Sequence, residues 1–198
     1  MQQVDKRQRI LEATFQLILS SGVDQISTAA IQRKSDVSRT TLYRYFPNRQ
    51  ELLEGVIGYM SDDVERRLQV MIAERPDPRD RLDIIIDLVV ERQVQQAGMR
   101  LLRGDPGFVM EALNQSMQRN IDILDAAMSD VYKSAENVLG EPVHRELISN
   151  LMTRFFASLM LLPSPELPGD FRLTLQAIFR SLMLDLRLEL PDDSAKIG

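Results

Sequence analysis

With 198 residues and no cysteine, the chain can bury one or two cores, and its composition excludes disulfides, thiolate nucleophiles and cysteine-ligated metal sites. No apolar run reaches the roughly 20 residues of a membrane-spanning helix, and the N-terminus lacks a signal-peptide core, so we expect a cytoplasmic protein without membrane association. The net charge of −5 alone argues against a nucleic-acid partner, but residues 1–50 carry eight basic and only four acidic residues.

Helical periodicity runs through the chain between proline and glycine breaks, and no alternating run of β-branched residues is bounded by hairpin turns. We therefore predict an all-α fold. A first helix is predicted over residues 5–20, ended by Gly22. Two short helices are predicted to follow, over residues 28–34 and 39–46. Together with the first helix they should form a three-helix domain of the helix-turn-helix type over residues 1–50.

A longer helix after Pro47-Asn48 carries apolar residues at steps of three and four, and it should link this first domain to the rest of the chain. Asp-Pro pairs at residues 77–78 and 105–106 are start signals for further helices. The remainder is predicted to be a helical-bundle domain over residues 51–190, followed by a disordered tail over residues 191–198. Its helices are expected over residues 52–71, 78–98, 106–139 (continuous or broken), 143–162 and 171–190.

The last two predicted helices carry apolar residues on more than one face. That pattern is typical of a helix in the centre of a bundle or at an oligomer interface. Because a chain of this length has little left to cover both helices, we favour a homodimer interface. The pattern leaves open which apolar stripe faces the partner subunit. The predicted interface consists of Leu147, Leu151, Phe155, Leu175, Ile178, Leu182 and Leu184.

The segment over residues 27–46 carries the sharpest functional signal. Ser27 and Ser38 are favourable N-caps for two short helices, and residues 35–37 form the turn between them. Two short helices that cross through a tight turn form the scaffold that lets the second enter the major groove of DNA. The positions predicted to face inward are Ala30, Ile31, Val37, Leu42 and Phe46.

The outward face of the second short helix suits DNA reading. Arg39 can offer two parallel donors to guanine, and Thr40 and Thr41 can meet a base edge with a hydroxyl or a methyl group. Tyrosine and arginine side chains beside them can reach phosphates. A merely solvated basic face is the alternative, and the two caps, the turn and the reading face in register favour DNA binding. The predicted DNA-binding residues are Lys6, Ser27, Thr28, Lys34, Ser38, Arg39, Thr40, Thr41, Tyr43, Arg44, Tyr45 and Arg49.

At these residues the chain resembles the tetracycline-repressor (TetR) family of regulators. The signature of that family is a hydroxyl cap, an isoleucine, a Val-Ser turn and a Leu-Tyr-x-x-Phe helix, which stand here at Ser27, Ile31, Val37-Ser38 and residues 42–46. The resemblance is strong over about the first quarter of the chain and extends to the rest only by helix layout. Departures from the family pattern are Gln32 and Ser35 for alanine, Asp36 for the turn glycine, Arg39-Thr40 for Lys-Gly, and Arg49 for lysine.

The resemblance implies a ligand-sensing domain that dimerises through its last two helices. A bound small molecule would move the linking helix, so that the two DNA-reading units no longer match successive major grooves. The predicted function is therefore a repressor that binds a palindromic double-stranded operator as a homodimer and is released by a small-molecule effector. The pocket is expected among the middle helices, lined by Met99, Leu102, Phe108, Met110, Met117, Met152, Phe155 and Phe156.

Two alternative functions were weighed against this one. An all-α enzyme has little support, because the sequence lacks the GxSxG, P-loop and HExxH motifs, and with one histidine no metal or cofactor is expected. A DNA-binding dimer that is controlled by a protein partner, or that activates transcription, stays open. An apolar cavity would favour sensing of a small molecule, whereas a solid core with an exposed apolar groove would favour a protein partner.

Overall fold

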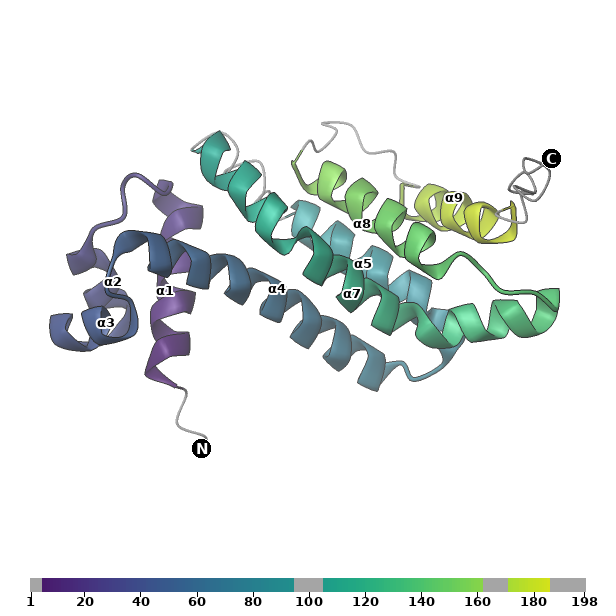
Figure 1. The fold of residues 1–198 in the computed structure, drawn as a ribbon, viewed down its shortest axis with the longest axis horizontal. Coiled ribbons are helices and arrows are strands. Elements are labelled where there is room, and N and C mark those ends of the chain that lie inside the picture. Colours follow the sequence, from purple (N-terminus) through teal and green to yellow (C-terminus); the bar gives the residue numbers. More distant parts are fainter. Residues whose placement is uncertain (1–4, 95–104, 162–170, 186–198) are drawn as a thin grey trace, which may run out of the picture.

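The computed structural model describes residues 5–94, 105–161 and 171–185, and every regular element within these ranges is a helix, which confirms the all-α prediction. Figure 1 shows the first helices gathered at one end of an elongated molecule, with a long helix leading from them to a bundle. None of the described helices has the length and apolar character to cross a membrane. The elements are α1 (Lys6–Ser21), α2 (Thr28–Ser35), α3 (Arg39–Tyr45), α4 (Arg49–Glu74), the 3₁₀ turn η1 (Pro78–Asp80), α5 (Arg81–Val94), α7 (Pro106–Leu139), α8 (Arg145–Leu161) and α9 (Phe171–Asp185).

We call α1, α2 and α3 the head. Asp5 caps α1 by accepting a hydrogen bond from the backbone N–H of Arg7 at 3.2 Å. Gly22 ends this helix with a φ of 84°, a left-handed value that glycine adopts without strain. The first helix therefore lies within one residue of its predicted limits. It packs against both α2 and α4, so the head rests on the long helix that leads away from it.

We call α5, α7, α8 and α9 the body. Helix α7 is continuous over 34 residues, because no proline or glycine follows Gly107 until Gly140 closes it with a φ of 74°. Helix α5 begins one 3₁₀ turn later than predicted, and α8 begins at Arg145 rather than at residue 143. Helix α7 packs along both α8 and α4, and α9 packs on α5. The linking helix therefore contacts the head at one end and the body along the rest.

Two apolar clusters hold these parts together. The first joins the head to the first half of α4 and to the start of α7, where Phe108, Val109 and Ala112 are buried. The second lies within the body and includes Leu68 of α4 and Leu124 of α7. Helices α4 and α7 thus contribute to both clusters. The first cluster also extends across residue 50, where we expected the first domain to end.

Candidate functional site

The two short helices of the head begin at the caps that their sequence predicts. The Ser27 hydroxyl accepts a hydrogen bond from the backbone N–H of Ala30, and the Ser38 hydroxyl accepts one from that of Thr41, each at 3.2 Å. Asp36 between the helices has a φ of 52° and a ψ of 49°, which is the left-handed conformation usual for glycine. The turn is therefore retained although aspartate replaces glycine.

Arg9 of α1 holds this turn in place. Its Nη2 donates to the backbone oxygen of Ser35 at 2.6 Å and to that of Asp36 at 3.2 Å, and it forms an ion pair with the Asp36 carboxylate at 3.1 Å. These bonds occupy carbonyls at the end of α2 that would otherwise lack partners. Arg9 could not be recognised from the sequence, because its partners lie 26 and 27 residues away and no local pattern marks them.

The outer face of α3 presents a connected group of polar side chains. The guanidinium carbon of Arg39 lies 5.6 Å from the centre of the Tyr43 ring, within the range of a cation–π contact. Hydrogen bonding to the side chain of Thr28, and to a lesser degree to that of Arg39, lowers the pKa of Tyr43. Arg39 and Tyr43 thus lie together on the exposed face of α3, where a phosphate or base edge can meet both.

The predicted DNA-binding residues differ in how far their side chains are exposed. The side chain of Thr41 is half-buried, and its hydroxyl lies 2.9 Å from that of Ser38, so it takes part in the cap rather than standing free. Thr28, already described at the start of α2, is half-buried as well. The exposed members of the set are Lys6, Ser27, Lys34, Ser38, Arg39, Thr40, Tyr43, Arg44 and Arg49.

Two of the predicted DNA-binding side chains contact other residues of the head. Tyr45 is half-buried against the first apolar cluster, because it follows Leu42 by three residues and so shares its inward face. The guanidinium of Arg49 donates to the backbone oxygens of Val23 at 2.5 Å and Ile26 at 3.3 Å. Tyr45 is therefore partly covered by the head, whereas Arg49 stays exposed and its contact with DNA stays a prediction.

The inward positions of the head are largely as predicted. Ile31, Leu42 and Phe46 are buried. Ala30 and Val37 are only half-buried, and Ser35 is buried in their place, with its hydroxyl donating to the oxygen of Ile31 at 2.7 Å. A serine could take this inward position because the turn of helix before it satisfies its hydroxyl.

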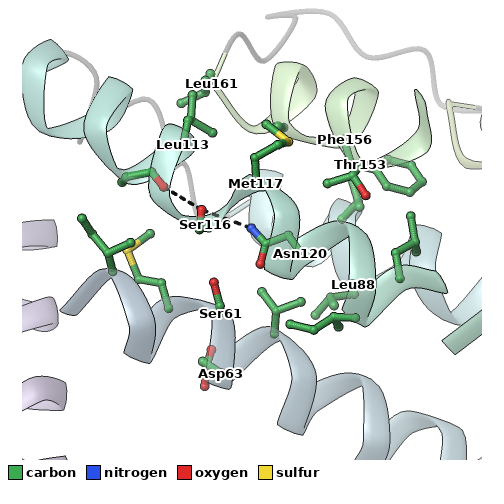
Figure 2. Close-up of a pocket in the computed structure, with 18 of the residues that line it drawn as sticks. Ser61, Asp63, Leu88, Leu113, Ser116, Met117, Asn120, Thr153, Phe156 and Leu161 are labelled. Carbon is green, nitrogen blue, oxygen red and sulfur yellow. Dashed lines mark hydrogen bonds between the residues drawn. The ribbon is translucent and has the colours of Figure 1, made fainter. Parts of the chain in front are cut away.

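A second candidate site is an apolar cavity of about 250 Å³ between the head and the body. It lies among α4, α5, α7 and α8, and Phe15 and Leu19 of α1 complete it. Figure 2 shows its wall, on which Leu88, Leu113, Met117, Phe156 and Leu161 contribute apolar side chains. A cavity of this kind is the usual form of a small-molecule site.

Some of the residues predicted for the pocket line this cavity, and others do not. Phe108, Met117 and Phe156 line it. Met110 follows Phe108 by two positions, so it points to the opposite side of α7 and is 56% exposed. Met152 is fully buried in the second cluster, and Phe155 is displaced around α8 from Phe156 toward solvent. These three residues are removed from the pocket, and Met99 and Leu102 lie outside the described residues.

The body also has an exposed apolar face on its last two helices. On α8, Leu147, Leu151 and Phe155 are exposed at steps of four, while the alternative stripe that contains Ile148 and Met152 is buried in the body. The structure thus decides which stripe of α8 is left uncovered in one protomer.

On α9 the prediction needs a correction. Leu175 is 1% exposed and packs within the body's own cluster, so it cannot face a partner subunit. Ile178 is exposed, and Leu173 is exposed on the same helix. The side chains of Leu182 and Leu184 lie outside the described residues.

Comparisons with known proteins agree with this architecture. Residues 10–56 match the model of "Bacterial regulatory proteins, tetR family". Over 134 residues the chain is 30% identical to the nucleoid occlusion factor SlmA of Marinomonas sp. (strain MWYL1), which covers 67% of this chain and 68% of that protein. SlmA of Shewanella frigidimarina is 28% identical over 160 residues, or 80% and 78% of the two chains. The crystal structure of the TetR family repressor AlkX from Dietzia sp. aligns with a TM-score of 0.62 at 19% identity, over 90% of this chain and 96% of that one.

Proposed function

Because the chain belongs to the tetR family of bacterial regulatory proteins, it is a DNA-binding transcription regulator, and we propose that it acts as a dimeric repressor of a palindromic operator, released by a small-molecule effector. The observation that carries this proposal is the capped helix α3, whose Arg39 and Tyr43 are exposed and in contact with each other. A rigid helix with polar side chains aimed outward is what major-groove reading requires.

In this proposal the helix-turn-helix domain over residues 1–50 reads the operator with two kinds of contact. Arg39 and Thr40 meet base edges, because both are exposed at the start of α3. Exposed cations and the hydroxyl of Tyr43 contact phosphates around them, and these contacts fix the register of the protein on DNA without reading its sequence. The proposed phosphate-contacting residues are Lys6, Lys34, Tyr43 and Arg44.

The function is tested by selecting bound fragments from a genomic or random-sequence duplex pool. A dimeric regulator of this family should return an inverted repeat with half-sites about one helical turn apart. A failure to enrich any sequence, with binding only to bulk DNA, would contradict an operator-specific repressor. The same selection yields the operator duplex that the later experiments use.

We expect the affinity for the selected operator to fall steeply with salt. Lys6, Lys34 and Arg44 are exposed, so a dimer brings about six cations to phosphates, which corresponds to a decrease of about 10³-fold between about 50 and 200 mM salt. Filter-binding titrations at several salt concentrations measure the slope. A flat response would contradict the proposed phosphate contacts.

The dimer is proposed to form through the exposed apolar face of α8 and α9. Replacing Leu151 by glutamate puts a charge into the centre of this face, so we expect half the mass of the wild-type dimer by light scattering and weaker operator binding. Val138 is exposed as well but belongs to α7 rather than to α8 or α9, so Val138→Glu is the matched control and should stay dimeric. A Leu151→Glu variant that stayed dimeric would exclude this face as the dimer interface.

The cavity supports sensing of a small molecule. Its wall is largely apolar and it lies against α4, the helix that carries the head, so a ligand there could bias the position of the head. Repression is the proposed direction of control, which is also the role stated for AlkX. Release of the operator duplex from the protein by a cavity ligand is the direct test.

A second candidate function follows from the curated relatives, which are named nucleoid occlusion factors. In that case a protein partner rather than a small molecule would control the DNA-bound dimer. The fragment selection separates the two functions: a repressor should return sites in front of few genes, whereas an occlusion factor should return many sites spread over the chromosome. We favour the repressor because of the cavity.

A further inference from the structure

The apolar cavity has one polar corner, formed where α4 and α7 face each other. Ser61 of α4 and Ser116 and Asn120 of α7 lie on its wall. In Figure 2 the hydroxyl of Ser61 and the amide of Asn120 point into the same part of the cavity from opposite helices. Most of the other lining residues labelled there are apolar, with Asp63 and Thr153 as the exceptions, so this corner can fix the orientation of a ligand.

Hydrogen bonds fix which end of the Asn120 amide is available. The Ser116 hydroxyl donates to the backbone oxygen of Ala112 at 2.7 Å, so it can only accept from Asn120. Asn120 accordingly turns its Nδ2 to Ser116, at 3.3 Å. Its Oδ1 is buried and has no hydrogen-bond partner within the described part of the chain. A buried acceptor without a donor is unfavourable, so a ligand that supplies the donor gains more than an ordinary hydrogen bond.

An ion pair on the outer side holds this corner together. Arg119, which precedes Asn120 on α7, pairs with Asp62, which follows Ser61 on α4. It also reaches Glu65 of α4 at 3.5 Å. The two polar side chains inside the cavity therefore stand on helices that are linked directly behind them.

The charged side chains on the cavity wall neutralise each other. Arg67 Nε lies 3.1 Å from the carboxylate of Asp63, and Arg67 Nη1 lies 2.9 Å from that of Glu91. Asp63 and Arg67 are the charged residues among those that line the cavity in the described structure. A charged ligand would find no unpaired countercharge there and would lose its hydration. The effector should therefore be neutral.

We infer that the effector is a neutral hydrophobic alcohol or phenol, whose hydroxyl donates to Asn120 Oδ1 and accepts from the hydroxyl of Ser61. This inference rests on the proposed sensing function and adds the chemical class of the ligand. A hydroxyl is the smallest neutral group that both donates and accepts, as these two side chains require. A cavity of about 250 Å³ accommodates on the order of ten non-hydrogen atoms, since about 150 Å³ holds benzene.

The test compares alcohols with ethers of similar size, which keep the oxygen acceptor and lack the hydroxyl proton. The pairs are 1-naphthol with 1-methoxynaphthalene, and 1-octanol with its isomer 1-methoxyheptane, each titrated calorimetrically into the full-length protein without DNA. For the wild type we expect at least one alcohol to bind about tenfold or more tightly than its ether. In Asn120→Leu this preference should fall to about onefold, because the acceptor is gone.

Two further variants separate the contact from a general loss of structure. Asn114→Leu changes an exposed asparagine of the same helix and should keep the full preference. Ser61→Ala should weaken an alcohol and its ether alike, because both lose the same donor. Equal binding of alcohol and ether to the wild type, no binding of either alcohol, or a preference that survives in Asn120→Leu would each overturn the inference. Since no DNA is present, these outcomes are independent of whether ligand binding releases the operator.

Discussion

Replacement of Arg39 by alanine is expected to reduce the affinity for the selected operator by about 10²-fold. Each lost bidentate base contact costs about 1–3 kcal/mol, and a dimer loses one in each half-site. The variant also removes the guanidinium that lies on the Tyr43 ring. Gel-shift titration with the selected duplex and with duplexes mutated at single positions measures both the affinity and the loss of base preference.

Two controls make this experiment specific. Arg33 is an exposed arginine at the end of α2 outside the proposed contact set, so Arg33→Ala removes the same charge and should change affinity little. Arg39→Lys keeps the charge but loses the planar pair of donors, so it should relax the base preference while the salt slope is retained. Unchanged operator binding by Arg39→Ala would remove this residue from the reading face.

Replacement of Gly55 by valine is expected to destabilise the head by about 1–3 kcal/mol and to abolish operator binding at concentrations where the wild type binds. A Cβ at this position would lie 2.9 Å from Phe46 Cε1 and 3.0 Å from Leu11 Cδ2. Helix α4 therefore approaches the head too closely for a side chain. Thermal unfolding followed by circular dichroism, together with gel shifts, measures the two effects.

Gly58 provides the matched control one turn further along α4. A Cβ there would meet no atom within 4 Å. Alanine in an open helical position gains about 0.5–1 kcal/mol over glycine, so Gly58→Ala should raise the melting temperature whereas Gly55→Ala should lower it. Equal effects of the two alanine variants would contradict the close contact between α4 and the head.

The sequence predicted those features that local chemistry determines. The caps at Ser27, Ser38 and Asp105 and the helix stop at Gly140 lie where predicted, because each depends on residues within one turn. The family signature lies in the same stretch, so the class of protein was predicted as well. The left-handed Asp36 stands where the family pattern has the turn glycine, so the resemblance rather than local chemistry pointed to this conformation.

What failed depended on contacts between distant parts of the chain. Met110 and Leu175 were assigned to a pocket and an interface, and packing in the whole molecule exposes the first and buries the second. The hydrogen bonds of Arg49 to carbonyls more than 20 residues earlier were missed for the same reason. Asn120 was missed because an orphaned acceptor can be recognised only once its neighbours are known.

The apolar cluster that the head shares with α4 and α7 determines where two related regulators should be joined in a chimera that exchanges their DNA specificity. A graft that ended at residue 50 would take Ile10 and Phe46 away from Leu52 and Val56, with which they are buried. A junction after Met60 would carry the whole contact face of α4 with the head. The recipient's residues 108–112 would then need to suit the incoming head, so a hybrid biosensor requires matching at a second, distant position in the chain.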